Sequence, residues 1–544
     1  MTSTLAPVQS VEHGQVFTRR WVVDLILDLA GYTPERDLAA LRAVEPAAGD
    51  GAFAMPMLDR LTSSLRANGR DLTEAGDAIR AYELQAVHTD SLRAKMAAFL
   101  VADGWPADEV AAFVEASVVT ADYLLATHAV GKVDVVVGNP PYIRLEDLGP
   151  DRLARYQSVS PAMMGRADIF VGFYDVSLDS LAPGGVCAFI CADRWMRNSY
   201  GKALRGKVVR GFAVDAVVTM HDAPAFEEEV SAYPAVTVLR RGAQAQTIVA
   251  TGTERFGRAA ARRLIEWLAD PSEPLEAEGL SAAVLPSWFE TDGLWPEASA
   301  VRIAWLERIA ETLPTIEGSG ARIRIGVATG ADAAYLVGPS GLPDIEPDRL
   351  LPMSMGDDIT SGTFVWGGRY LVSPWDSDGL VSLDEYPKMA AYLSGHPRVA
   401  ARSIARRSGP AWYRTIDRVF SEVTAKPKLL MEDMKARAHP VLEEGGHYPH
   451  HNLYYITSDT WDLRVLGGLM LSEVVEAQVA AYCVKMRGGT LRFQAQYLRQ
   501  VRIPAPAQIP APVARRLAEA FNARDRDAAT AAALEAFGLD ALPK

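Results

Sequence analysis

Val133-Asp134-Val135-Val136-Val137-Gly138-Asn139-Pro140-Pro141-Tyr142 is the stretch that decides how this chain folds. Its first five residues are mostly β-branched and apolar, which is typical of a buried strand. The strand ends at Gly138 and leaves Asn139 at its carboxyl end, where open parallel sheets bind ligands. The two prolines fix φ and lack N–H groups, so the Asn139 amide and the Pro140 carbonyl remain as directed acceptors. Together with the Tyr142 ring they favour a flat ligand that carries an exocyclic amino group. A strand that ends in an ordinary turn is the alternative.

The composition is that of a globular protein with more than one domain. The chain has 544 residues, of which 49% are hydrophobic and 23% charged, and this length allows two or three domains with sizeable cores. No apolar run approaches the length of a membrane span and no signal-peptide pattern is present, so we expect a cytoplasmic protein without a membrane partner. The cysteines are few and are not spaced as metal ligands: Cys187, Cys191 and Cys483. We therefore expect buried, reduced thiols and no metal site.

Three histidines, His447, His450 and His451, lie close together in the sequence. A zinc site is conceivable there, but no cysteine and no paired acid accompanies them. The sequence therefore does not favour zinc binding.

Three basic stretches stand out against a net charge of −13. Residues 192–210 hold six basic side chains and one acid, residues 396–437 hold ten and four, and residues 485–502 hold five and none. Aromatic residues are interleaved with them: Trp195, Trp412, Tyr413, Phe493 and Tyr497. Basic stretches with aromatics are typical of a nucleic-acid surface, although a solvated face remains the alternative for each.

A strand, a glycine turn and a helix follow the N-terminal segment. Thr18 occupies the N-cap position of an amphipathic helix predicted over residues 21–30. Residues 41–45 read as a short strand that runs into Pro46-Ala47-Ala48-Gly49-Asp50-Gly51, and residues 53–65 have helical spacing. This unit opens nucleotide-binding α/β domains, but the third glycine of the dinucleotide fingerprint is missing, so a NAD site is not favoured.

Acidic residues end the next two predicted strands. Glu83 ends residues 78–83, where a carboxylate can accept both hydroxyls of a ribose, and Asp122 ends residues 118–123. Glu45, Glu83, Asp122 and Asn139 are therefore expected at one rim of one sheet.

The alternation of strands and helices divides the chain into four parts. We expect an α/β domain with a doubly wound sheet over residues 1–242 and a helical connector over 243–315. A mixed, β-rich domain is expected over 316–505, with short strands at 363–370, 428–432 and 453–457. A helical tail is expected over 506–544.

The ordered motifs resemble those of the gamma-class N6-adenine DNA methyltransferases of bacterial restriction–modification systems. They are Phe17-Thr18, Glu45 to Gly51, Tyr82-Glu83, Ala121-Asp122-Tyr123 and Asn139-Pro140-Pro141-Tyr142, followed by a long C-terminal domain. The resemblance is dense over residues 13–240 and looser over 316–504. It implies a Rossmann-like class I methyltransferase domain followed by a target-recognition domain. In that domain residues 406–414 and 487–496 match family segments, whereas Gly326, Thr329 and Gly330 are expected to set chain geometry.

The resemblance also implies S-adenosyl-L-methionine as cofactor. Thr18, Glu45, Ala47, Gly49 and Gly51 would line its methionine end, with Glu45 on the ammonium group. Glu83 would hold the ribose hydroxyls, and Asp122 and Tyr123 the adenine. Two positions depart from the family pattern, since Arg19 stands where many members have proline and Ala48 where cysteine is frequent.

The catalytic residues implied by the resemblance are Asn139, Pro140, Pro141, Tyr142 and Phe226. Asn139 and Pro140 would each accept one N–H of the target amino group, which localises the nitrogen lone pair for methyl transfer. The adenine would be flipped out of the duplex and stacked on Tyr142 and Phe226.

The expected partner is double-stranded DNA, bound by a monomer. Because about a dozen residues precede His13, we expect any restriction endonuclease to be a separate protein. Alternatives are methylation of RNA or of a protein glutamine by the same chemistry, and a DNA-binding defence subunit with a vestigial pocket.

Overall fold

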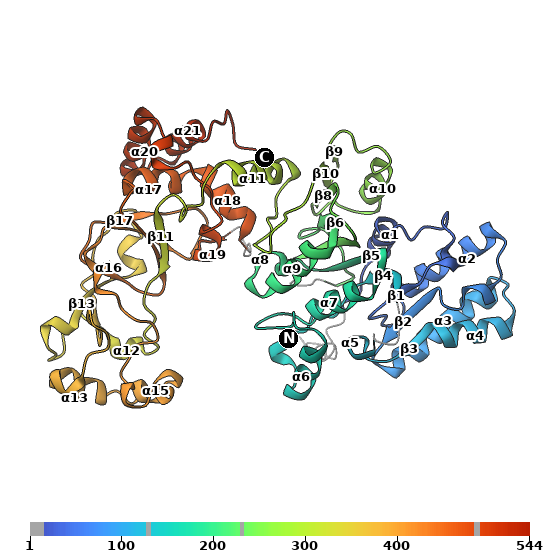
Figure 1. The fold of residues 1–544 in the computed structure, drawn as a ribbon, viewed down its shortest axis with the longest axis horizontal. Coiled ribbons are helices and arrows are strands. Elements are labelled where there is room, and N and C mark those ends of the chain that lie inside the picture. The colour runs from blue at the N-terminus through green and yellow to red at the C-terminus, as the bar shows by residue number, and fades with distance from the viewer. Residues whose placement is uncertain (1–15, 127–131, 229–232, 484–489, 544) are drawn as a thin grey trace, which may run out of the picture. The chain divides into compact units, whose positions relative to one another are not determined.

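The computed structural model describes residues 16–126, 132–228, 233–483 and 490–543. The chain divides into two compact units, Met1–Ala304 and Trp305–Lys544, which we call unit 1 and unit 2 (Figure 1). Three segments singled out in the sequence fall partly outside the described residues. They are the start of the motif region at 13–15, residues 229–232 after Phe226, and residues 485–489 of the third basic stretch.

One large sheet organises unit 1. Its strand order is β3-β2-β1-β4-β5-β7-β6-β8-β10-β9. The strands from β3 to β5 run parallel, and β7 lies antiparallel between β5 and β6. The bounds are β1 (Ala43–Glu45), β2 (Ile79–Glu83), β3 (Val118–Thr120), β4 (Val133–Gly138), β5 (Leu181–Ala192), β6 (Phe212–Thr219), β7 (Pro234–Arg241), β8 (Thr247–Gly252), β9 (Leu275–Ala277) and β10 (Leu280–Leu285).

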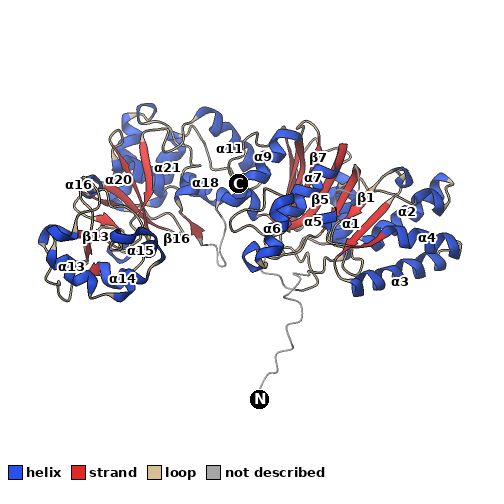
Figure 2. Cartoon of the chain, turned by 60° about the horizontal axis from the view of Figure 1, so that its bottom comes forward, coloured by secondary structure: helices blue, strands red, loops and turns tan. Residues whose placement is uncertain are grey.

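Helices cover both faces of this sheet (Figure 2). Alternate residues of β4 enter different cores: Val135 and Val137 pack with one layer of helices, and Val136 packs with the other. The first layer comprises α1 (Arg20–Leu29), α2 (Ala54–Asn68), α3 (Ala86–Ala102), α4 (Ala107–Ser117) and α10 (Arg258–Trp267). The second comprises α5 (Tyr123–Ala126), α6 (Pro150–Val159), α7 (Phe170–Ser180), α8 (Arg194–Arg197) and α9 (Lys202–Gly211). This arrangement confirms the predicted doubly wound α/β fold.

The sheet continues past the boundary expected at residue 242. In place of a purely helical connector over 243–315, β8 pairs parallel to β6, and β10 pairs antiparallel to β8 and β9. The predicted helices of this region are present as α10 and α11 (Ala300–Thr312). The strands were missed because alanine-rich segments such as 280–285 carry a helical preference that sheet pairing overrides.

Both cysteines of β5 and Cys483 are buried, and none of the three forms a disulfide bond. Cys187 and Cys191 face the core on the α7 side, and burial raises the pKa of each thiol. The expected buried thiols are therefore observed.

Unit 2 is built from small sheets and short helices, as expected for a mixed, β-rich domain. The sheet orders are β11-β19-β15-β17, β12-β14-β13-β18 and β16-β20. The strands are β11 (Ala321–Ile325), β12 (Leu336–Val337), β13 (Leu350–Ser354), β14 (Tyr370–Val372), β15 (Lys428–Glu432), β16 (Met434–Lys435), β17 (Val441–Glu443), β18 (Tyr448–Pro449), β19 (Leu453–Ser458) and β20 (Leu491–Arg492). The predicted strands at 428–432 and 453–457 are confirmed as β15 and β19. Of residues 363–370 only Tyr370 belongs to a strand, since Gly368 takes a φ of +75° that interrupts it.

The helices of unit 2 lie both between its strands and after them in the sequence. They are α12 (Asp332–Tyr335), α13 (Pro387–Ser394), α14 (Pro397–Ala401), α15 (Ser403–Ser408), α16 (Ser421–Ala425), α17 (Leu463–Leu471), α18 (Glu473–Tyr482), α19 (Ala495–Leu498), α20 (Ala511–Ala523) and α21 (Arg526–Ala536). The tail helix α20 packs on α17 so closely that a Cβ at Gly468 would lie 2.3 Å from the Leu517 carbonyl oxygen. The tail is therefore an integral part of unit 2.

Within the described residues no single helix is long and apolar enough to cross a membrane. The pair α17 and α18, bent by 65°, passes such a test by length and composition only.

Candidate active site

A cavity opens at the carboxyl ends of β1, β2, β3 and β4. The predicted strand-end residues Glu45, Glu83, Asp122 and Asn139 all line it. Of the other residues implied by the motifs, Thr18, Ala47, Gly49, Tyr123 and Pro141 also line it. Gly51, Pro140, Tyr142 and Phe226 are not part of that lining. Gly51 instead lies against α3, where a Cβ would meet Leu92 at 2.7 Å.

The Asn139 amide is held in one orientation. Its Nδ2 donates to the Val16 carbonyl oxygen at 2.9 Å and to Thr18 Oγ1 at 3.1 Å. Because a carbonyl can only accept, the amide nitrogen must face Val16. Asn139 Oδ1 is buried and has no partner among the described residues. The amide thus presents an acceptor that lacks a donor.

The segment that carries Thr18 is fixed by the loop that carries Phe226. Thr18 and Phe226 form an isolated antiparallel bridge. Arg19 N donates to the Ala225 carbonyl oxygen at 3.0 Å, and Arg19 Nε donates to the Phe226 carbonyl oxygen at 2.8 Å. The N-cap role expected for Thr18 is wrong, since the N-cap of α1 is Arg19. Arg19, which departs from the family pattern, joins the two segments.

The rings of Tyr142 and Phe226 are neighbours. Their centroids lie 6.3 Å apart at an interplanar angle of 85°, an edge-to-face contact. The Tyr142 hydroxyl is buried without a hydrogen-bond partner among the described residues, and burial raises its pKa well above the usual range. The structure thus brings together the two aromatic residues that the sequence assigned to one role.

Glu45 is a buried acid with a free oxygen. The residue is 1% exposed, and its Oε2 has no hydrogen-bond partner among the described residues. Burial raises the pKa of its carboxyl well above the usual range, although hydrogen bonds from the Phe53 and Ala54 backbone act against this. A cationic ligand group in the cavity would be stabilised by such a carboxylate.

Glu83 is oriented by backbone donors at the end of β2. Its Oε2 accepts from Gly49 N at 3.0 Å and its Oε1 accepts from Gln85 N at 2.8 Å. A carboxylate has further lone pairs for hydroxyl donors. Gly49, with a φ of +53°, lets the turn after β1 approach this acid.

Comparison with known proteins places the chain in a family. Residues 74–226 match the Eco57I restriction-modification methylase family. Type II methyltransferase M.PaeR7I of Pseudomonas aeruginosa is 43% identical over 549 residues, which cover 99% of this chain and 94% of that protein. Type II methyltransferase M.XhoI of Xanthomonas vasicola is 40% identical over 545 residues, which cover 97% of this chain and 98% of that protein. The chain belongs to the type II methyltransferases of restriction–modification systems.

This membership confirms the resemblance drawn from the motifs and makes the chain a DNA methyltransferase. A solved structure, the type IIL restriction-modification enzyme MmeI in complex with DNA, shares the fold. Its TM-score is 0.54 at 12% identity, over 96% of this chain and 74% of that one.

The methyltransferase cavity has a wall that the sequence did not reveal. The Tyr156 hydroxyl donates to Asp122 Oδ2 at 2.7 Å, and Arg152 Nε donates to the Tyr156 hydroxyl at 2.6 Å. Both residues come from α6 and line the cavity. Only the helical spacing of four residues between them could have indicated a shared face.

Tyr123 takes part in the core of the methyltransferase more than in the cavity. Its ring stacks on Phe173 at 5.7 Å and contacts Tyr82 edge to face at 5.3 Å. Its hydroxyl lies 3.0 Å from Ser177 Oγ, and the residue is 3% exposed. Tyr123 therefore supports the wall beside Asp122.

The first basic stretch is used largely inside the methyltransferase fold. Arg197 pairs with Asp193, both 2% exposed, and Arg205 donates to the carbonyl oxygens of Trp195 and Asn198. Lys207 pairs with Asp175. These three of the six cations make internal contacts, whereas Lys202 and Arg210 are exposed.

Proposed function

We propose that this methyltransferase transfers a methyl group from S-adenosyl-L-methionine to the exocyclic N6 of an adenine in double-stranded DNA. The observation that carries the proposal is the buried Asn139 Oδ1, which has no partner within the described ranges and is held in place through Nδ2. A buried acceptor without a donor costs about 1–3 kcal/mol, so a ligand N–H is its expected partner.

The amino group of adenine is a weak nucleophile because its lone pair is delocalised into the ring. Asn139 Oδ1 and the Pro140 carbonyl accept its two N–H groups, and these fixed acceptors stabilise the positive charge that develops on nitrogen. Because Pro140 and Pro141 hold the backbone, little reorganisation accompanies the reaction. The cofactor, when bound, supplies an electrophilic methyl group on a sulfonium.

The cavity fits this cofactor by the chemistry of its donor set. Glu45 Oε2, which is buried and has no partner in the described part of the chain, suits the ammonium group. Glu83 has lone pairs left for the ribose hydroxyls after its two backbone contacts. Asp122, oriented by Tyr156, suits the amino group of the cofactor adenine.

The target base has to leave the duplex to reach Asn139, at a cost of a few kcal/mol. Stacking on Tyr142 and Phe226, worth about 1–3 kcal/mol for each base–aromatic contact, offsets that cost. Since the two rings now touch edge to face, one of them moves when the base enters.

The same membership supports a biological role as the modification arm of a restriction–modification system. We infer that a separately encoded endonuclease acts with it. The methylated adenine then marks the sites that the endonuclease must spare.

The experiment is transfer of tritiated methyl from the cofactor to duplex DNA, RNA and protein, followed by chromatography of the labelled nucleosides. We expect label in N6-methyladenine of duplex DNA. The rate of labelling should fall by about 10²–10³-fold in Asn139→Ala and be retained in Asn68→Ala, a matched change at an exposed asparagine of α2. Label in cytosine, in RNA or in glutamine, or transfer by Asn139→Ala at the wild-type rate, would overturn the proposal.

A further inference from the structure

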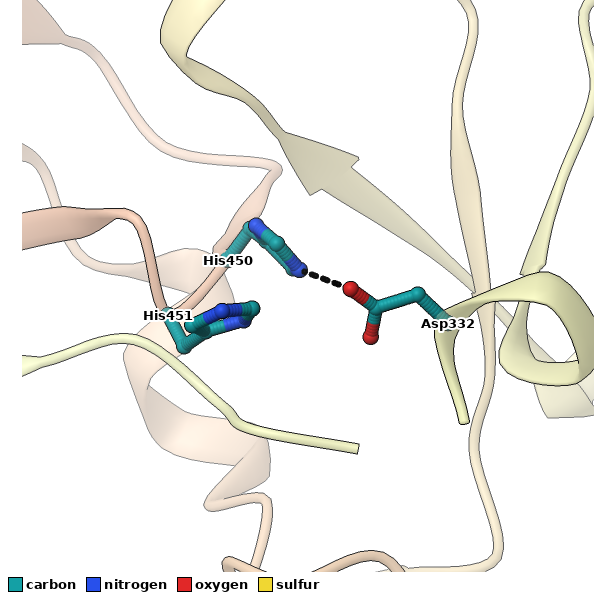
Figure 3. A group of neighbouring side chains, drawn as sticks. All are labelled: Asp332, His450 and His451. Carbon is teal, nitrogen blue, oxygen red and sulfur yellow. Dashed lines mark hydrogen bonds and ion pairs between the residues drawn. The ribbon is translucent and has the colours of Figure 1, made fainter. Parts of the chain in front are cut away.

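An acid and two histidines of unit 2 meet although they are far apart in the sequence. Asp332 begins α12, whereas His450 and His451 precede β19 (Figure 3). One ligand atom from each of the three lies within 4.8 Å of the others. Asp332 is the paired acid that the sequence did not show, and it lies 118 residues upstream of His450.

His447, the third histidine noted in the sequence, is engaged elsewhere. Its Nδ1 lies 2.9 Å from Glu443 Oε1, and its ring packs against Phe364 and Trp366. The cluster therefore consists of two histidines and one carboxylate.

Outer partners orient the two inner side chains of the cluster. Thr329, which is buried, donates its hydroxyl to Asp332 Oδ1. His450 Nδ1 lies 2.9 Å from Asn452 Oδ1. What remains is Asp332 Oδ2 and His450 Nε2, which face each other at 3.3 Å. Such outer contacts are typical of ligand side chains at metal centres, where they fix the tautomer and the carboxylate plane.

The protons available at His450 do not satisfy these contacts. A neutral imidazole has one N–H, yet both ring nitrogens of His450 face an oxygen atom. With the proton on Nδ1, the Nε2 lone pair points at a carboxylate oxygen, and a cation between them would remove the repulsion.

The spacing also matches a small divalent ion. Two ligands at about 2.0–2.1 Å from a tetrahedral zinc ion lie about 3.3 Å apart. The Asp332 Oδ2 to His450 Nε2 distance is 3.3 Å. His451 is exposed and its ring centroid lies 4.0 Å from that of His450, so its ring can turn to complete the set.

The backbone beneath the cluster is firmly held. Val327 N donates to the Pro449 carbonyl oxygen at 2.9 Å, and His451 N donates to the Val327 carbonyl oxygen at 3.1 Å. At Gly326 a Cβ would lie 2.2 Å from the His450 carbonyl oxygen, so only glycine allows this approach. The two segments are therefore positioned before any ion binds.

A second cluster of similar composition, in unit 1, differs because it already contains a positively charged side chain. Asp193, His221 and Glu297 of unit 1 also lie within 4.8 Å of one another. Arg197 already supplies a cation there, because its guanidinium pairs with both Asp193 and Glu297. Among the described residues no Lys or Arg side chain forms an ion pair with Asp332.

We propose that Asp332, His450 and His451 bind a divalent transition metal ion of the zinc class. The ion ties the turn at Thr329–Asp332 to the turn at His450–Asn452, and its remaining coordination position is open to water. Imidazole nitrogens and a carboxylate oxygen are ligands that Zn²⁺ accepts. This site is separate from the cofactor cavity and adds a structural element to unit 2.

The test is titration of the full-length, chelator-treated protein with ZnCl₂ in a calorimeter, without DNA or cofactor. We expect one saturable site and a rise in melting temperature that saturates with it. His451→Ala and Asp332→Asn should each weaken binding by at least tenfold, since loss of an outer partner alone costs about 10–100-fold. His396→Ala, outside the cluster, should leave binding unchanged.

A spectroscopic readout separates this site from weak surface binding. Co²⁺ in place of Zn²⁺ should give visible absorption bands of a nitrogen- and oxygen-ligated ion, and Asp332→Asn should abolish them. His451 is exposed, so His451→Ala is expected to fold and keeps the test decisive if another variant does not. Absence of saturable Zn²⁺ binding, or equal affinity in His451→Ala, Asp332→Asn and wild type, overturns the proposal.

Discussion

The cofactor rim of unit 1 and the basic stretch of unit 2 use polar side chains in opposite ways. At the rim, Glu45 is buried and Asn139 is half-buried, and each has a buried oxygen without a hydrogen-bond partner among the described residues. In the stretch 396–437, Arg402 donates to the carbonyl oxygens of Val399, Thr329, Trp412 and Arg414. A polar residue at a strand end therefore indicated a functional site. The number of basic residues in a stretch of sequence did not show how many of them are available to bind a ligand.

The difference has a physical cause. A group at the carboxyl end of a parallel strand faces an opening by geometry, since the helix that follows starts beyond it. A surface arginine can turn inward and satisfy several carbonyl groups of loops that lack regular pairing. Unit 2 has many such loops, so its cations act partly as internal donors.

The largest expected effect is on the catalytic rate, when Asn139 of unit 1 is changed. Asn139→Ala should lower kcat by about 10²–10³-fold, as loss of a preorganised acceptor does elsewhere, while cofactor affinity is unchanged. Rapid-quench methylation assays and calorimetric cofactor titration measure the two quantities. Thr18→Val, which removes only one anchor of the amide, should cost about 1 kcal/mol, roughly fivefold in kcat. Equal losses in both variants would contradict the role of the free Oδ1.

In unit 2 the corresponding change should act on stability. Arg402→Met leaves several carbonyl groups without a donor and should destabilise the fold by about 2–4 kcal/mol, with no direct effect on cofactor affinity. Urea unfolding with hydrogen exchange around residues 329–335 and 412–414 measures this. Arg398→Met, at an exposed position in α14, is the control and should be neutral within about 0.5 kcal/mol. A neutral Arg402→Met would show that the internal contacts of this arginine are not required.

Cofactor affinity should depend on pH through Glu45. Below its raised pKa the carboxyl is protonated, and pairing with the ammonium group requires the carboxylate. Binding therefore releases a proton, and the Kd for S-adenosylmethionine should fall as pH rises through this raised pKa. Glu45→Gln should weaken binding by about 1.5–3 kcal/mol and remove this dependence. Calorimetric titration in buffers of different ionisation enthalpy detects the proton, and its absence in the wild type would argue against the pairing.

The smallest expected effect is on cofactor affinity. It concerns Tyr156, in the α6 wall of the cavity that was not predicted from the sequence. Tyr156→Phe removes the donor to Asp122 and should raise the cofactor Kd about fivefold, equivalent to about 1 kcal/mol, with kcat unchanged. Tyr32→Phe is the matched control, since that buried hydroxyl contacts the Met57 carbonyl oxygen and not the cavity. A change confined to kcat would place Tyr156 in a different role.

Most of the candidate site that could be predicted from the sequence came from the motifs at strand ends. Glu45, Glu83, Asp122 and Asn139 meet because parallel strands fix where their carboxyl ends lie, and that rule needs no tertiary detail. Arg152 and Tyr156 come from a helix whose placement depends on packing, so no local pattern assigned them to the cavity. Asp332 was missed for a similar reason, since it meets His450 only through loop pairing across 118 residues.

Two strands and two helices were also missed, for a separate reason. Strands β8 and β10 extend a sheet that already exists, so their pairing partner decides their structure more than their composition does. Helices α17 and α18 were not predicted because glycines and β-branched residues weaken the helical signal of residues 463–482.

The three buried cysteines have a practical consequence for labelling. The thiolate is the form that reacts with maleimides, and burial keeps Cys187 and Cys191 both shielded and protonated. Cys483 is shielded as well. A cysteine introduced on the surface of each unit can therefore carry a fluorophore without removal of the native thiols. Energy transfer between two such probes would compare the distance between the units with and without duplex DNA.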